Sequence, residues 1–217
     1  MSYASDERAA LCALLDETGP DAPTLCEGWR TGDLAAHLVL RERRPDAAAG
    51  LMGGPLAGHT RRVNDALSRQ TPFPHLVQLI RTGPPPLSLF RLPGMDERLN
   101  LVEFFVHHED VRRGAEGWQP RKLTDGLTEA LWQRLQRSKL LFRRSPVGVE
   151  LARDDLTTDV GQRQVRMTAR ARTPVVTVTG HPAELMMWAL GRTGAARVRL
   201  DGTADAVRQL GTARRGV

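Results

Sequence analysis

The sequence is poor in several kinds of residue, and each shortage excludes a class of protein. Two cysteines, Cys12 and Cys26, are too few for a disulfide framework and form no CxxC metal pair. We therefore expect a reducing, cytoplasmic location. No apolar run approaches the length of a membrane span, and the acidic, amphipathic N-terminus lacks the pattern of a secretory signal. No membrane partner is expected.

Lysine is almost absent, because only Lys122 and Lys139 occur, and the net charge of +6 comes from arginine. Arginine, alanine, glycine and proline all have GC-rich codons, so this bias can reflect the genome instead of a ligand. A nucleic-acid surface would combine a basic stripe with aromatic residues. Here aromatic residues are only 5% and the arginines are scattered among acids, so we expect no nucleic-acid partner.

The spacing of apolar residues changes along the chain and predicts two domains of an α+β protein. Helical periodicity dominates up to about Ser145, and alternating or β-branched strand patterns follow. The expected helices of the first part span residues 5–17, about 31–44, 59–70, 74–82, 95–114 and 123–143. Strands are expected at 146–155, 164–171, 174–180 and 196–202, with helices at 181–192 and 203–210. We therefore predict a helical bundle at 1–145 and a small α+β domain at 146–217.

Two segments of the first part lack a helical pattern. Residues 46–58 are rich in glycine and alanine, and we expect them to be irregular. Residues 83–94, GPPPLSLFRLPG, are predicted to be a connector, because three consecutive prolines fit neither a helix nor a central strand.

The stretch LVEFFVHHEDVRRG, residues 101–114, carries the strongest candidate chemistry. Glu103 and His107 are four residues apart, so on a helix they share one face and both can reach one metal ion. Imidazole and carboxylate suit a divalent metal such as zinc. His108 points about 100° away and is expected to take no part. Asp110 follows His107 by three residues and could hold its other ring nitrogen.

A metal site needs a third ligand from another helix, and the candidate is His37. It lies between Leu34 and Leu38, on the face expected to meet the core, where a histidine must be satisfied by a hydrogen bond or a metal. Three ligands would leave positions for water or substrate, which is the catalytic pattern. The alternatives are a solvated pair for Glu103 and His107, and a core histidine partnered by a carbonyl or by Asp33.

The remaining histidines and Cys26 have plainer interpretations. His59 and His75 are expected at the surface, and His181 at the start of a helix. Cys26 could act as a nucleophile, but the sequence shows no base beside it. The motif CEGW instead indicates a packed turn with Trp29.

Several motifs together resemble a known family. The stretch TLCEGWRTGDLAAHLVLRE, residues 24–42, looks like the start of the mycothiol-dependent maleylpyruvate isomerase family of the DinB-like metal-binding superfamily. The stretch VEFFVHHEDVRRG resembles the E-x-x-x-H-x-x-D helix of that family. The resemblance implies a four-helix bundle in which His37, Glu103 and His107 bind a divalent metal, with zinc expected.

The C-terminal part resembles the same family. VTVTGHPAELMMWALGR followed by VRLDG is similar to its small sterol-carrier-protein-like α+β domain. The resemblance implies that mycothiol, the actinobacterial low-molecular-weight thiol, serves as cosubstrate. Arg192, and with less support Arg112 or Arg113, could bind an acidic substrate or the thiol. The alternatives are a salt bridge of Arg192 with Glu184 and a charge pair at the helix C-terminus. Residues 46–95 contain no stretch that we can align with the family, so its substrate is not carried over.

Three functions remain open at this stage. The first is a metal- and thiol-dependent transferase or isomerase acting on a small electrophilic molecule, the second a non-catalytic metal-binding protein, and the third a metal-dependent hydrolase. The oligomeric state, monomer or homodimer, is equally open.

Overall fold

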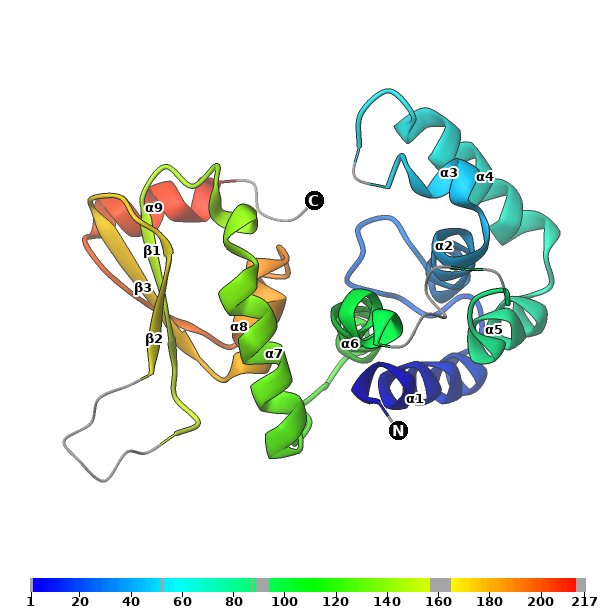
Figure 1. Ribbon diagram of the computed structural model, residues 1–217, viewed down its shortest axis with the longest axis horizontal. Coiled ribbons are helices and arrows are strands. Elements are labelled where there is room, and N and C mark those ends of the chain that lie inside the picture. Colours follow the sequence, from blue (N-terminus) through cyan, green and yellow to red (C-terminus); the bar gives the residue numbers. More distant parts are fainter. Residues whose placement is uncertain (1, 52, 87, 89–93, 157–164, 214–217) are drawn as a thin grey trace. The chain divides into compact units, whose positions relative to one another are not determined.

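The computed structural model describes residues 2–51, 53–86, 88, 94–156 and 165–213. The chain divides into two compact units at residues 120 and 121, coloured from blue to green and from green to red in Figure 1. The first unit is helical and the second contains a four-stranded sheet, so the predicted α+β class is confirmed.

The first unit contains six helices within its described residues. They are α1 (Tyr3–Thr18), α2 (Thr31–Arg43), α3 (Pro45–Ala48), α4 (Ala57–Gln70), α5 (Phe73–Thr82) and α6 (Met95–Gly114). Helix α1 begins at Tyr3, before the expected start at residue 5, because the Ser2 side chain accepts a hydrogen bond from the Ser5 backbone N–H and caps the helix. The short α3 extends into residues 46–58, which we expected to be irregular. The predicted connector at 83–94 lies partly outside the described residues.

Four of these helices enclose the core of the first unit. Helix α1 packs against α5 and α6, and α2 packs against α4 and α5. The buried apolar side chains come from α1, α2, α5 and α6, and include Leu11, Leu15, Leu34, Leu38, Val77, Ile80 and Phe104. Helices α2 and α6, which carry the candidate ligands, are therefore held by buried residues, from Thr31 to Glu42 on α2 and from Asn100 to Arg113 on α6.

The second unit begins with α7 (Asp125–Arg137) and a 3-10 turn, η2 (Lys139–Phe142). Its strands β1 (Gly148–Arg153), β2 (Arg166–Arg170), β3 (Val175–Gly180) and β4 (Arg199–Asp201) form a sheet of order β2-β1-β3-β4. Strand β1 pairs with β3 in parallel, and the two edge strands pair antiparallel. Helices α8 (Pro182–Ala189) and α9 (Ala204–Thr212) complete the unit, and α8 packs against α7, β1 and β3.

This division differs from the boundary we expected between residues 145 and 146. Helix α7 belongs to the second unit because it packs against α8. Its buried side chains include Leu131, Trp132 and Leu135. The amphipathic pattern of α7 shows that one face is buried, but it does not say which partner covers it.

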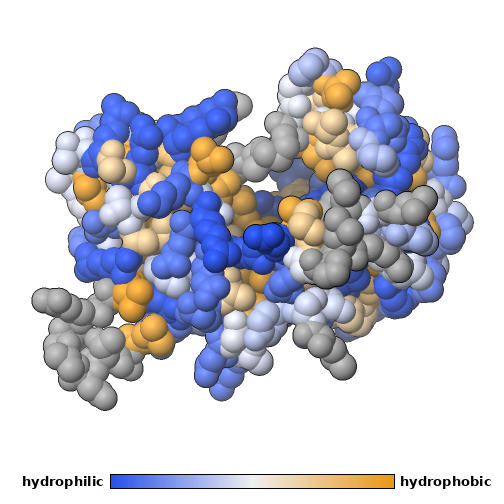
Figure 2. Space-filling model, in the orientation of Figure 1, coloured by the Kyte–Doolittle hydropathy of each residue, from blue (hydrophilic) through white to orange (hydrophobic). Residues whose placement is uncertain are grey.

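The surface agrees with the scattered charges of the sequence. Hydrophilic residues are spread over the visible face of both units, and hydrophobic residues form smaller patches among them (Figure 2). Among the described residues, no helix combines the length and the hydropathy needed to cross a membrane.

Candidate metal centre

Helix α2 brings His37 to the interior of the first unit. The helix starts at Thr31, where the Asp33 side chain accepts hydrogen bonds from the Arg30 backbone N–H at 3.1 Å and from the Ser68 hydroxyl at 2.8 Å. Asp33 therefore stabilises the helix start and is not the partner of His37. Only 13% of the His37 side chain is exposed, because its neighbours on α2 pack into the core.

Helix α6 supplies the other two candidate ligands. Glu103 and His107 lie one turn apart, and Nε2 of His107 is 3.2 Å from Oε1 of Glu103. The Nε2 of His37 is also 3.2 Å from that oxygen. The imidazole rings of His37 and His107 meet edge to face, with centroids 5.2 Å apart. One ligating atom from each residue thus lies within 4.8 Å of the other two, which is the geometry of a possible metal site.

Asp110 holds the far side of the His107 ring. Its Oδ2 lies 2.9 Å from Nδ1 of His107, and its side chain is fully buried. This is the contact expected from the spacing of three residues. A carboxylate at this position accepts the Nδ1 proton and leaves Nε2 to face the ligand group. His108 points elsewhere, because its Nδ1 lies 3.0 Å from Oε2 of Glu7 on α1.

The charge states of the three residues favour a cation between them. Burial lowers the pKa of His37. Burial would lower the pKa of His107 too, but hydrogen bonds with Asp110, Cys26 and Glu103 outweigh it and raise that pKa well above the usual value. Burial would raise the pKa of Glu103, yet its hydrogen bonds with the two histidines hold it well below the usual value.

The donor set therefore fits a divalent metal ion. With Nδ1–H of His107 bound to Asp110, a neutral ring directs the lone pair of Nε2 toward the carboxylate of Glu103. Two electron-rich atoms at 3.2 Å need a positive charge between them, and a metal ion or a proton can supply it. Two imidazoles and one carboxylate are also ligands that zinc accepts in open sites.

Arg41 adds a positive charge one turn after His37 on α2. Its Nε lies 3.5 Å from Oε1 of Glu103. Its other guanidinium nitrogens donate to the side chain of Asn100 and, at 2.8 Å, to the carbonyl of Leu99. Arg41 is thereby fixed against α6 and holds the Glu103 carboxylate in place.

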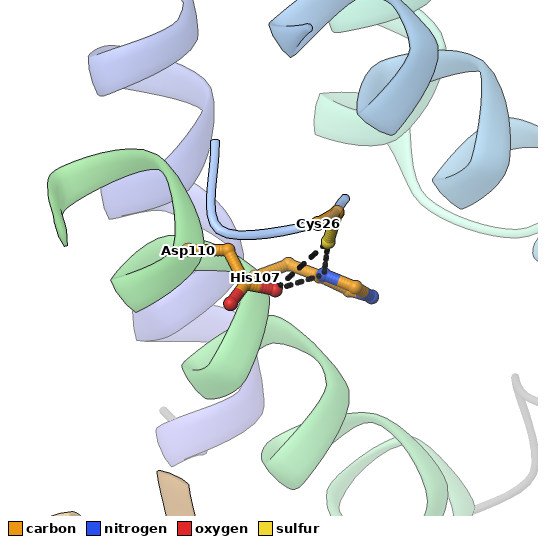
Figure 3. A group of neighbouring side chains, drawn as sticks. All are labelled: Cys26, His107 and Asp110. Carbon is orange, nitrogen blue, oxygen red and sulfur yellow. Dashed lines mark hydrogen bonds and ion pairs between the residues drawn. The ribbon is translucent and has the colours of Figure 1, made fainter. Parts of the chain in front are cut away.

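The loop between α1 and α2 places Cys26 at the same site, which the sequence did not predict. Its Sγ lies 3.2 Å from Oδ2 of Asp110 and 3.9 Å from Nδ1 of His107 (Figure 3). The loop is attached by a hydrogen bond of 3.0 Å from the Leu25 backbone N–H to the Asp110 carbonyl. The Trp29 ring lies 5.2 Å from the His37 ring. The signal that the sequence offered for this contact was the position of Cys26 shortly before the helix predicted to carry His37.

We expect the substitution Gly114→Ala to separate this loop from α6. An added Cβ would lie 2.3 Å from the Pro23 carbonyl oxygen and 2.8 Å from Cα of Thr24, both backbone atoms. Overpacking of this kind costs about 1–3 kcal/mol. Thermal unfolding followed by circular dichroism measures the loss. The matched control is Gly58→Ala, where a Cβ meets nothing within 4 Å. Equal melting temperatures for the two variants would show that the loop does not press on Gly114.

The two arginines predicted to bind an acidic substrate or the thiol both have protein partners of their own. Arg113 is buried, its Nε donates to Glu109 at 2.6 Å, and its guanidinium lies 4.5 Å from the Trp118 ring centre. Arg192 follows α8 in the second unit and donates to the Leu190 carbonyl at 2.8 Å. Glu184, the salt-bridge partner considered for it, accepts a hydrogen bond from the Arg197 backbone N–H at 2.8 Å.

The chain was also compared with known proteins. Residues 2–85 match the family described as the mycothiol maleylpyruvate isomerase N-terminal domain. The chain resembles a solved structure described as the crystal structure of the mycothiol-dependent maleylpyruvate isomerase, with a TM-score of 0.52 and 17% identity. The likeness covers 91% of this chain and 88% of that one, and at this identity it supports the fold. A comparison with curated proteins finds no significant match.

The family match includes α1 to α5, and with them the Cys26 loop and His37. The structural likeness extends the agreement in fold over most of the remaining chain. The family resemblance found in the sequence is thus confirmed over residues 2–85, which match the mycothiol maleylpyruvate isomerase N-terminal domain and include most of residues 46–95, where no counterpart was expected.

Proposed function

We propose that the protein is a thiol-dependent isomerase or transferase that binds a divalent metal ion, with zinc expected, at His37, Glu103 and His107. The carrying observation is the convergence of two imidazole nitrogens on one carboxylate oxygen, each at 3.2 Å, from two separate helices. Mycothiol is the proposed thiol, since the matched family and the similar structure are both described by it. A small electrophilic molecule is the proposed substrate.

The side chains around the ligand group have distinct proposed roles. Asp110 fixes the orientation and tautomer of His107, and Arg41 holds Glu103. A bound divalent ion would stabilise a thiolate over a thiol and so supply a nucleophile near neutral pH. Three protein ligands leave room for that sulfur beside the ion.

Arg192 remains our proposed contact for an acidic group of the substrate or the thiol. Arg113 is the weaker candidate, because its buried guanidinium is paired with Glu109 and packed on Trp118. We also keep the inference of a cytoplasmic location, which is supported by two cysteines that form no disulfide.

The test compares wild type with His37→Ala and with His75→Ala, an exposed histidine of α5. Metal content is measured by plasma mass spectrometry on protein purified without chelator or nickel. Turnover of maleylpyruvate and other small electrophiles is measured with and without mycothiol. We expect His37→Ala to lose the metal and to lower thiol-dependent turnover by at least about 100-fold, because an absent Lewis acid costs several kcal/mol. His75→Ala should match wild type.

Each alternative function has its own signature in this experiment. Turnover that needs the metal but no thiol would identify a hydrolase. Stoichiometric metal without turnover of any electrophile would identify a non-catalytic metal-binding protein. Wild-type metal content in His37→Ala would contradict the proposed ligand set.

A further inference from the structure

Cys26, His107 and Asp110 form a second group of metal-ligating side chains, distinct in its donor atoms from the first. The Sγ, Nδ1 and Oδ2 atoms point toward one another (Figure 3). Sγ lies 3.2 Å from Oδ2 and 3.9 Å from Nδ1, and Nδ1 lies 2.9 Å from Oδ2. A tetrahedral zinc ion with bonds of about 2.0–2.3 Å places its ligand atoms roughly 3.3–3.7 Å apart. Small side-chain adjustments would therefore let these three atoms coordinate one ion.

The donor atoms indicate which ions this second group would select. A thiolate is a soft ligand, and together with an imidazole and a carboxylate it favours zinc or cadmium. Magnesium and calcium prefer oxygen ligands throughout, so the group discriminates against them. The first group contains no sulfur, and for that reason the two groups differ in their preference for thiophilic ions.

The backbone holds this second group together without any ion. The Leu25 N–H donates to the Asp110 carbonyl at 3.0 Å, so the loop is attached to the residue whose carboxylate Cys26 contacts. The Cys26 N–H donates to Oγ1 of Thr24 at 3.1 Å, and the Trp29 N–H donates to the Cys26 carbonyl at 2.9 Å. Asp110 is fully buried. The cysteine is thus positioned by its own turn and by α6.

The two groups share His107 but use different ring nitrogens. Binding beside His37 and Glu103 takes the lone pair of Nε2 and leaves the proton on Nδ1, where Asp110 accepts it. Binding beside Cys26 takes the lone pair of Nδ1. A neutral imidazole has only one free lone pair, so it can serve one ion at a time.

We propose that Cys26, Asp110 and Nδ1 of His107 form a second binding site for a thiophilic divalent ion, and that this ion and the one bound through Nε2 exclude each other. Binding at the second site releases the Cys26 thiol proton and the Nδ1 proton of His107 to solvent and leaves the remaining ring proton on Nε2, so that no lone pair faces Glu103. Excess cadmium or zinc would therefore inhibit the protein by displacing the first ion. The exclusion, unlike the second site itself, rests on the proposed function.

The test uses cadmium as the probe, added to the chelator-treated full-length protein. A thiolate bound to cadmium gives a charge-transfer absorption in the ultraviolet, which a site made of histidine and glutamate lacks. The double variant His37→Gln with Glu103→Gln removes the first site and keeps the second. We expect it to bind one cadmium ion per chain with this absorption. Cys26→Ser should lose the absorption, and wild type should bind no more than one ion.

Cys12→Ser is the matched control, because Cys12 is the other thiol of the chain. It is fully buried, and burial raises the pKa of its thiol to about 11, so it should bind no cadmium. The absorption must therefore survive in Cys12→Ser. Circular dichroism before metal addition verifies that every variant is folded.

The contradicting results separate this inference from the proposed function. Cadmium bound by wild type without the absorption, and lost in the double variant, would refute the second site and leave the first standing. Two cadmium ions per wild-type chain would refute the exclusion. If the double variant shows the absorption and Cys26→Ser binds no cadmium at all, the second site is supported and the first is contradicted.

Discussion

Replacing Glu103 by glutamine should remove the metal from the protein and lower thiol-dependent turnover by at least about 100-fold. Glutamine keeps the shape of the side chain and loses its negative charge. The carboxylate of Glu103 is the contact shared by His37, His107 and Arg41. Without it, a divalent ion would meet two neutral imidazoles and the nearby positive charge of Arg41.

The loss of metal affinity should exceed the loss caused by substituting a residue that only orients a metal ligand. Removing such an orienting partner typically weakens metal binding by about 10–100-fold. A direct ligand that also carries the negative charge of the group has a larger effect. The affinity is measured by competition between the protein and a chromogenic chelator, for wild type and Glu103→Gln.

Glu116→Gln provides the control, since Glu116 is exposed and follows α6 in the same unit. It should retain the metal affinity and turnover of wild type. If Glu103→Gln bound metal as tightly as Glu116→Gln, the ion would have to be held elsewhere, and the ligand set would be wrong.

The second large effect concerns stability, and it follows from a buried arginine of α1. Replacing Arg8 by methionine should destabilise the first unit by about 3–5 kcal/mol, the typical cost of breaking a buried ion pair from one side. Arg8 binds Glu42 through two hydrogen bonds, of 2.8 Å and 2.6 Å. It also donates to Asp96 and to the Ile80 carbonyl, each at 3.0 Å.

These contacts link Arg8 to the helices that carry the candidate ligands. Glu42 lies near the end of α2 and Asp96 near the start of α6. Asn100 joins them, because its Nδ2 donates to both carboxylates and its Oδ1 accepts from Arg41. Methionine would leave two buried or half-buried carboxylates without their cation. The destabilisation should therefore appear in α1, α2 and α6 together.

Hydrogen exchange followed by mass spectrometry measures this effect in each helix separately. Peptides from α7, α8 and α9 serve as an internal control, since they belong to the second unit. Arg81→Met is the matched variant, because Arg81 pairs with Asp16 at the surface and such pairs contribute about 0–1 kcal/mol. If hydrogen exchange in α1, α2 and α6 were equally fast in Arg8→Met and Arg81→Met, the buried ion pair would add no more stability than a surface ion pair.

Local patterns in the sequence were sufficient for much of the first unit. Helix α6 was predicted at residues 95–114 and is found from Met95 to Gly114. The contacts of Glu103 with His107, and of His107 with Asp110, follow from spacings of four and three residues. Helix geometry is the same in every protein, so such spacings translate directly into neighbours. His37 was predicted because a polar residue between buried leucines needs a partner.

Contacts between distant parts of the chain could not be predicted in this way. Cys26 and Asp110 are 84 residues apart, and they meet because a backbone hydrogen bond attaches the loop to α6. His108 on α6 contacts Glu7 on α1, which lies 101 residues earlier in the chain. Composition and periodicity show that a side chain needs a partner, but the partner depends on how the helices pack.

By itself, therefore, the sequence determined the type and approximate limits of most helices and strands, the family resemblance, and the face that Glu103 and His107 share. The tertiary structure alone decided that His37 reaches the same oxygen as His107, that Cys26 joins Asp110, and that α7 packs with the second unit. The physical reason is the range of the interactions. Backbone geometry and periodicity act within one or two turns, whereas the packing of helices and loops brings together residues far apart in the chain.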